Sequence, residues 1–157
     1  MNNLGQTMKI KENLLPLILI CNFVWFGGCF KDSTKSFVCF QKHCFEVEIA
    51  TNDLERAQGL QNRQKLDEDK GMLFIFSYQD VYPFWMKSTL IPLDIIWLDY
   101  NKRIVHIKHN APPCQTPLCP TYTPSEDAIY VVELNGGVAE KINLKIGDVG
   151  SFKLSSE

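Results

Sequence analysis

The chain has 157 residues, of which 45% are hydrophobic and 22% charged, and its formal net charge is −2. A chain of this length and composition forms one domain with a substantial hydrophobic core. A nucleic-acid-binding domain usually carries clustered basic residues and a clear excess of positive charge. The balance of charge therefore excludes that footprint, and we expect no nucleic-acid partner.

The first 28 residues have the pattern of an export signal. Lys9 and Lys11 precede an apolar run over 14–26. A basic start followed by an apolar stretch of this length is typical of a secretory signal. The run is shorter than the roughly 20 residues that a membrane-spanning helix requires. The sequence therefore predicts a lipoprotein-type signal peptide over residues 1–28.

The end of this signal predicts a lipid attachment. Gly27 and Gly28 stand before Cys29, in an arrangement similar to a bacterial lipobox, in which the cysteine thiol receives the lipid. Residues 29–36 are mostly polar and are interpreted as a tether. We expect export to the cell envelope, with the membrane bound through lipidated Cys29 on the periplasmic face. A soluble secreted protein and an uncleaved anchor are the alternatives.

Four more cysteines follow, in two pairs with four residues between partners. Four cysteines allow three disulfide connectivities, and the local one, Cys39–Cys44 with Cys114–Cys119, is the simplest. Disulfides are typical of oxidising compartments, in agreement with export. A four-thiolate metal site is the alternative. We expect two disulfides, no metal and no cofactor.

Residues 37–155 are expected to form a single β-rich domain. Strand-like alternation over 43–50 places Phe45 and Val47 on one face. Asn52 followed by Glu55 is a helix-start pattern, with Leu54, Ala57 and Leu60 on its apolar face. A second helical turn is expected over 135–142. The predicted strands are 36–40, 43–50, 71–76, 93–100, 103–109, 128–134 and 149–154. The fold class is mainly β, a small barrel or sandwich of about seven strands with one or two short helices.

Five segments, in this order, resemble the domain of unknown function 192 family. They are EIATNDLERAQGLQNR, GMLFIF, FWMKSTLIPLDIIWLD, APPCQTPLCPTY and YVVELNGG. The resemblance covers roughly residues 43–152 and implies a small β-barrel or sandwich, often behind a signal peptide. It implies no reaction, ligand or catalytic residue. Gln61 stands where the family usually has Met, and Ser88 where it usually has Asn.

The segment 84–100 combines two tryptophans and several aliphatic residues with Lys87 and Asp94. An unpaired buried charge costs several kcal/mol, so each of these charges should have a partner. Arg56, Arg63 and Lys87 are the candidate partners of Asp94. Their pairing can be a carboxylate–cation cluster at the mouth of a cavity, or a buried salt bridge that fixes the helix to the sheet.

Glu133 raises the same question on another strand. Residues 129, 131, 133 and 135 alternate onto one face, so that Glu133 follows two aliphatic residues. If that face is interior, Glu133 is a second inward carboxylate alongside Asp94. Paired carboxylates can perform general acid–base catalysis, as in glycosidases.

Aromatic residues are concentrated in the same parts of the chain. They are either the lining of a pocket for a sugar or an apolar ligand, or ordinary core and rim packing. The residues concerned are Tyr78, Tyr82, Phe84, Trp85, Trp97 and Tyr122.

Together these patterns favour an uncharacterised lipid-anchored domain of the cell envelope that acts as a non-catalytic binding or accessory module. Its ligand would be a small molecule, a glycan or a protein. The alternative is a hydrolase, acting for example on glycans, with Asp94 and Glu133 as acid and base. The candidate binding residues are Arg56, Trp85, Lys87, Thr89, Asp94 and Glu133.

Overall fold

The computed structural model describes residues 35–155. The predicted signal peptide, Cys29 and residues 30–34 of the predicted tether lie outside the described residues. The last part of the tether, Ser36, already belongs to the first strand and is buried. Its hydroxyl lies 3.2 Å from that of Ser155, the last described residue.

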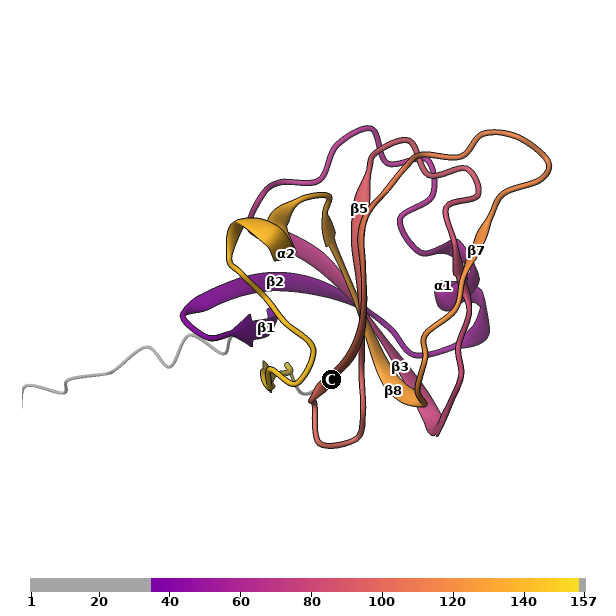
Figure 1. Ribbon diagram of the computed structural model, residues 1–157. Helices are drawn as coiled ribbons and strands as arrows, with labels where there is room; N and C mark the ends of the chain where they lie inside the picture. Colours follow the sequence, from indigo (N-terminus) through magenta and orange to yellow (C-terminus); the bar gives the residue numbers. More distant parts are fainter. Residues whose placement is uncertain (1–34, 156–157) are drawn as a thin grey trace, which may run out of the picture. The chain divides into compact units, whose positions relative to one another are not determined.

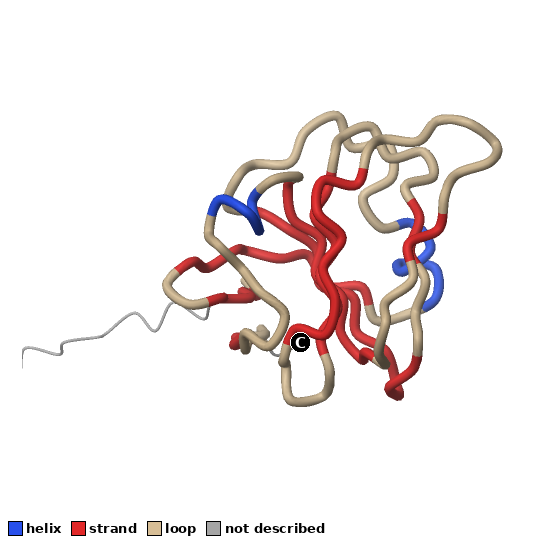
Figure 2. Tube along the Cα trace, viewed as in Figure 1, coloured by secondary structure: helices blue, strands red, loops and turns tan. Residues whose placement is uncertain are grey.

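The described region is mainly β, as expected, with nine strands and two short helices (Figure 1). Seven strands form one sheet and the other two form a small separate ribbon (Figure 2). The strands of the main sheet are β1 (Ser36–Phe40), β2 (His43–Ala50), β3 (Lys70–Asp80), β5 (Leu93–Leu98), β6 (Ile104–Ala111), β8 (Ala128–Asn135) and β9 (Gly150–Lys153). The ribbon pairs β4 (Phe84–Trp85) with β7 (Thr121–Tyr122), and the helices are α1 (Asp53–Gln58) and α2 (Val138–Lys141).

The main sheet curls toward closure. Its strand order is β6-β5-β8-β3-β2-β1-β9, and every pair is antiparallel except β2 with β3. The two edge strands meet at one end, where the Ile104 amide donates to the Asp148 carbonyl at 2.8 Å and the Gly150 amide donates to the Lys102 carbonyl at 2.9 Å. The sheet therefore has an inner, concave face and an outer face, each with its own core.

The two cores divide the aliphatic and aromatic residues by strand alternation. The inner core includes Phe40, Val47, Leu73, Ile96, Val132 and Leu134, and α2 contributes Val138 and Ala139 to it. The outer core includes Met72, Phe74, Ile95, Trp97 and Val131, and is covered by Leu60, Met86 and Phe84. All six residues of β5 are buried, so this strand is covered on both faces.

Most predicted elements are present, and the deviations have physical causes. The strand predicted over 93–100 is β5, which begins after Pro92 as expected but ends at Leu98 because a turn begins at Asp99, and the short strand β4 was not predicted. β3 extends to Asp80, beyond its apolar part, after a bulge between Ile75 and Asp80. The long loop after Asn110 contains β7, which covers part of the outer face.

Helix α1 begins as the sequence indicates but packs differently. The Asn52 side chain accepts a hydrogen bond from the Glu55 amide at 2.9 Å, and the Glu55 carboxylate accepts one from the Asn52 amide, forming a capping box. The predicted apolar face is wrong, because Leu54 is 84% exposed and Ala57 is exposed. Leu60, which is buried, follows the end of this short helix.

Both local disulfides are present, Cys39–Cys44 and Cys114–Cys119. They exclude the alternative of a four-thiolate metal site and indicate an oxidising, exported environment. Among residues 35–155, no helix has the length and apolar character needed to cross a bilayer.

Candidate functional site

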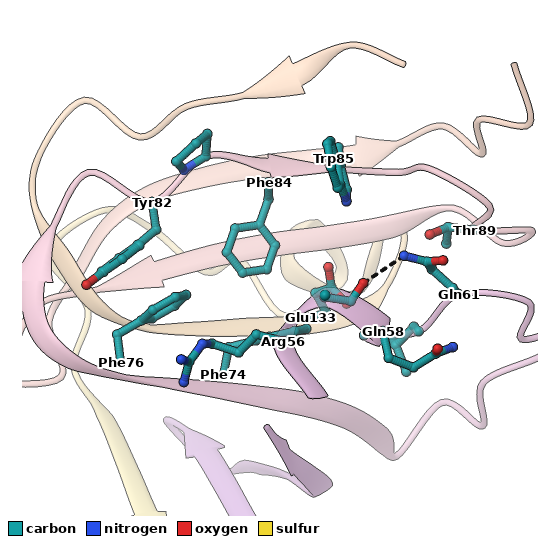
Figure 3. A pocket seen from close by; sticks show the side chains of 14 residues that line it. Arg56, Gln58, Gln61, Phe74, Phe76, Tyr82, Phe84, Trp85, Thr89 and Glu133 are labelled. Carbon is teal, nitrogen blue, oxygen red and sulfur yellow. Dashed lines mark hydrogen bonds between the residues drawn. The ribbon is translucent and has the colours of Figure 1, made fainter. Parts of the chain in front are cut away.

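A pocket of about 220 Å³ opens on the outer face of the main sheet (Figure 3). Its floor is formed by strands β3 and β8, one wall by α1 and the turn after it, and the opposite wall by the segment around β4. The side chains that line it are Arg56, Ala57, Gln58, Leu60 and Gln61 on one wall, Tyr82, Pro83, Phe84, Trp85 and Thr89 on the other, and Phe74, Phe76 and Glu133 on the floor, with Gly59 at the end of α1. We call it the outer-face pocket.

The β4 wall is held in place by aromatic packing. The Phe84 ring lies edge-on to Phe74 and Trp97, with centroids 4.9 and 5.7 Å apart. The Tyr82 ring stacks on Phe76 at 3.6 Å, and the Trp97 indole N–H donates to the Tyr82 carbonyl at 2.8 Å. These contacts make this wall a rigid, largely apolar surface rather than a mobile loop.

Arg56 fixes the opposite wall. Its guanidinium donates to the backbone carbonyls of Thr51 and Ile75, the latter at 2.9 Å, and pairs with Asp53 at 2.5 Å. It also lies 5.0 Å from the centre of the Phe76 ring. Its donors therefore bind the helix to β3, so that Arg56 shapes the pocket wall with a charge that is already paired.

Glu133 is a buried ionisable side chain of the pocket. It is 5% exposed, and its cross-strand neighbours are Met72 on β3 and Ile95 on β5, both apolar. Burial raises the pKa of the Glu133 carboxyl to about 8. Within residues 35–155 its carboxyl takes part in no hydrogen bond or ion pair, so that desolvation alone accounts for the shift.

Asp94 has a different environment from the one expected. It is fully buried, and its carboxylate accepts hydrogen bonds from the amides of Asn110 (2.7 Å), Gly137 (3.1 Å) and Ala139 (2.7 Å). The last two amides lie at the start of α2, where an acidic side chain is favoured. The expectation of a cationic partner was wrong, because backbone N–H groups satisfy this carboxylate.

The register of the sheet separates the two carboxyls. Asp94 is opposite Leu134 and Ile95 is opposite Glu133 on adjacent strands. Since directly opposed residues point to the same face, Asp94 faces the inner core with Leu134, whereas Glu133 faces the outer core with Ile95. The pair of inward carboxylates that the hydrolase alternative required is therefore not formed.

The other two cations expected to pair with Asp94 make contacts elsewhere. Lys87 is exposed rather than buried, and its ammonium lies 5.7 Å from the centre of the Trp85 ring. Arg63 pairs with Glu48 at 2.5 Å on the surface. Of the six candidate binding residues, Arg56, Trp85, Thr89 and Glu133 line the outer-face pocket, Lys87 lies beside it on Trp85, and Asp94 lies on the opposite face of the sheet.

The Cys114–Cys119 disulfide supports the wall that carries Thr89. The Cys114 carbonyl accepts a hydrogen bond from the Ser88 amide at 2.9 Å, and Cys114 forms isolated bridges with Lys87 and Thr89. The Asn62 amide donates to the Ser88 carbonyl at 2.8 Å, which joins the two walls at this end. The pocket thus depends on contacts among segments that are distant in the sequence.

Comparison with known proteins gives the family. The family model DUF192, described as "Uncharacterized ACR, COG1430", matches residues 37–152. The chain belongs to the DUF192 family. A UPF0127 protein of Thermococcus gammatolerans is 26% identical over 116 residues, which are 71% of this chain and 69% of that protein.

Solved structures share the fold of this DUF192 domain. A crystal structure of a protein of unknown function from Novosphingobium aromaticivorans has a TM-score of 0.68 and 33% identity, and the match covers 74% of this chain and 83% of that one. A Sinorhizobium meliloti protein, solved as a proposed transcription regulator, has a TM-score of 0.69 and 30% identity over 75% of this chain and 92% of its own. These relatives establish the family and leave its chemistry to be argued from the site.

The aromatic residues singled out in the sequence fall into two groups. Tyr82, Phe84 and Trp85 line the pocket, and Trp85 is 53% exposed at its rim. Trp97 is core, whereas Tyr78 is exposed and the Tyr122 ring lies under the ammonium of Lys108. Part of the set therefore lines a pocket, and the rest is core or surface packing.

Sequence reasoning missed several lining residues. Phe74 and Phe76 occupy alternate positions of β3 and share the outer face, a signal that the period of two contains. Gln58 and Gln61 line the pocket because α1 ends at Gln58 and the chain turns there, and neither residue belongs to a recognisable motif. Among the side chains that the structure describes, no three His, Cys, Asp or Glu residues gather as a metal-ligand set.

Proposed function

We propose that this DUF192 domain is a lipid-anchored binding module of the cell envelope that holds a small ligand in the outer-face pocket without acting on it chemically. The observation that carries the proposal is the combination of aromatic walls with the buried Glu133 carboxyl, which has no partner in the described region. Buried polar groups are normally hydrogen-bonded, and an unpartnered one that lines a pocket is a candidate ligand contact.

The anchoring part of the proposal rests on the N-terminal pattern and on the disulfides. The basic start, the apolar run and Gly27-Gly28-Cys29 support a signal of the lipoprotein type, with the lipid on Cys29 and the residues before β1, 29–35, as the tether. The two disulfides agree with export to an oxidising compartment. Lipidation would place the domain at the periplasmic face of a membrane.

The anchor is tested by replacing the proposed lipid-bearing cysteine. We expect Cys29→Ser to move the full-length protein from the membrane fraction to the soluble fraction after cell fractionation. Cys21→Ser, within the proposed signal, is the matched control and should leave the protein in the membrane. Unchanged membrane association of Cys29→Ser would contradict lipid anchoring.

The pocket is tested by titrating the domain with three small ring-containing probes, 2-phenylethylamine, 2-phenylethanol and glucose. Amide chemical shifts should change for residues of the pocket walls, 56–61 and 82–89, with at least one probe. Trp85→Ala should weaken that binding. Tyr100→Ala, which removes another exposed aromatic outside the pocket, should not. Absence of binding by all three probes would contradict a ligand pocket.

A further inference from the structure

The carboxyl of Glu133 has no hydrogen-bond or ion-pair partner among the described residues. Its neighbours across the sheet, Met72 and Ile95, have no donor for it. The nearby guanidinium of Arg56 is committed to two carbonyls and to Asp53. The Glu133 side chain nevertheless lines the pocket, which leaves the pocket as the direction from which a partner can approach (Figure 3).

The walls around this carboxyl suit a particular kind of partner. Aromatic faces attract cations through the negative charge density of their rings, and the attraction grows when the cation is desolvated. Phe74, Phe84 and Trp85 supply such rings on two sides of the pocket. A carboxylate at the floor of an aromatic pocket is complementary to an organic cation, with the charged end at Glu133 and the apolar body against the rings.

The size of the pocket limits the ligand. An apolar cavity of about 150 Å³ holds a benzene molecule. The outer-face pocket, at about 220 Å³, has room for one ring and a short chain. A peptide or an oligosaccharide would have to extend beyond it over the exposed edge of Trp85.

We propose that the outer-face pocket selects a small protonated amine with an apolar or aromatic body, and that Glu133 is the group that recognises its ammonium. This deepens the proposed function, on which it rests, by naming the class of ligand. The ligand would contribute the positive charge and the N–H donors that Glu133 lacks inside the fold.

The pH dependence of binding follows from this recognition. An ammonium pairs with the ionised carboxylate, whereas Glu133 without ligand keeps its proton up to a pKa of about 8. The other charged or titratable groups at the pocket are Arg56, Lys87 at the rim and Tyr82, whose pKa is raised mainly by burial. The affinity for an amine should therefore rise about tenfold from pH 6 to pH 7 and level off above pH 8.

The experiment compares 2-phenylethylamine with 2-phenylethanol, which has the same ring and chain but no charge. Calorimetric titrations at pH 6, 7 and 8 should show binding of the amine that strengthens with pH and exceeds that of the alcohol at pH 8. Glu133→Gln should lower the affinity for the amine at least tenfold at pH 8 and abolish the pH dependence of that affinity. Glu140→Gln, on the exposed side of α2, is the matched control and should change neither.

The outcomes separate the two proposals. Equal affinity for the amine and the alcohol, or full amine binding by a folded Glu133→Gln variant, would overturn the cationic class while the pocket remained a ligand site. Absence of binding by both probes would overturn this inference, and the proposed function would fall with it if glucose also failed to bind. Thermal unfolding of Glu133→Gln, measured alongside, shows that a loss of binding does not reflect a loss of folding.

Discussion

Asp94 and Glu133 are two carboxyls buried in neighbouring strands, yet their surroundings in the fold are opposite. On the inner face, Asp94 accepts three backbone hydrogen bonds and joins β5 to the start of α2 and to β6. On the outer face, Glu133 has apolar neighbours and opens to a pocket. Burial alone therefore does not mark a site. A buried carboxylate whose hydrogen bonds are made within the fold stabilises that fold, whereas a carboxyl without a protein partner that opens to a pocket is available for a ligand.

Replacement of Asp94 by alanine should produce the largest effect. It leaves the amides of Asn110, Gly137 and Ala139 without their acceptor in a buried place. Hydrogen bonds to charged groups contribute about 1.5–3 kcal/mol each and are not additive, so we expect a loss of about 4 kcal/mol in the free energy of unfolding. Urea denaturation measures it, with exposed Asp127→Ala as the control that should change little. A loss of less than about 1 kcal/mol would show that Asp94 is not the structural member of the pair.

Glu133→Gln, in contrast, should increase the free energy of unfolding relative to the wild-type protein at pH values above about 4.5. The folded protein keeps the Glu133 proton up to pH about 8, whereas the unfolded chain releases it near 4.5. Between these values the folded state binds more protons, so the free energy of unfolding falls as pH rises, by about 1.4 kcal/mol per unit. Relative to the glutamine variant, the wild-type protein should lose about 3 kcal/mol between pH 5.5 and pH 7.5. Urea denaturation of both proteins across this range should give profiles that diverge, and parallel profiles would contradict a desolvated carboxyl.

The two disulfides allow a matched comparison between an effect on stability and an effect on ligand binding. Each joins cysteines five positions apart, so removal of either by a double Cys→Ser substitution should cost about 2 kcal/mol on the chain-entropy account. Only the loss of Cys114–Cys119 should weaken the binding of 2-phenylethylamine, because Cys114 supports the pocket wall around Ser88 and Thr89. Unfolding curves and titrations of both double variants decide this, and an equal effect on binding would contradict it.

Trp85→Ala should give the smallest change in stability. The side chain is 53% exposed and sits at the rim, so that its removal should alter the free energy of unfolding by about 0.5 kcal/mol or less. Its effect should be on ligand affinity instead. A large loss in stability, seen in a thermal scan, would place Trp85 in the structural framework and not at the mouth of a site.

The sequence predicts the elements well because their signals are local. The capping box at Asn52 and Glu55, the alternation in β2 and the spacing of the cysteines each lie within a few residues. The apolar residues on both sides of Asp94 in β5 are likewise a local signal of a buried strand. Such patterns depend on the period of a helix or strand, which a single segment contains.

The partners of the two carboxyls could not be predicted in the same way. Whether Asp94 and Glu133 share a face depends on the register between β5 and β8, which is a property of two strands about 40 residues apart. The three donors to Asp94 are backbone amides, which no side-chain pattern reveals. Arg56 and Lys87 likewise look like free cations in the sequence, whereas the fold pairs one with Asp53 and places the other on Trp85.

The central claim, that Glu133 is a desolvated carboxyl kept for a cationic ligand, is tested most directly by its own titration. Carbon-13 chemical shifts of the glutamate carboxyls report the pKa of Glu133, assigned with the Glu133→Gln variant. We expect a pKa of about 8 without ligand and a clearly lower pKa with saturating 2-phenylethylamine. A pKa near 4.5 in the free protein, or a pKa that the amine leaves unchanged, would contradict it.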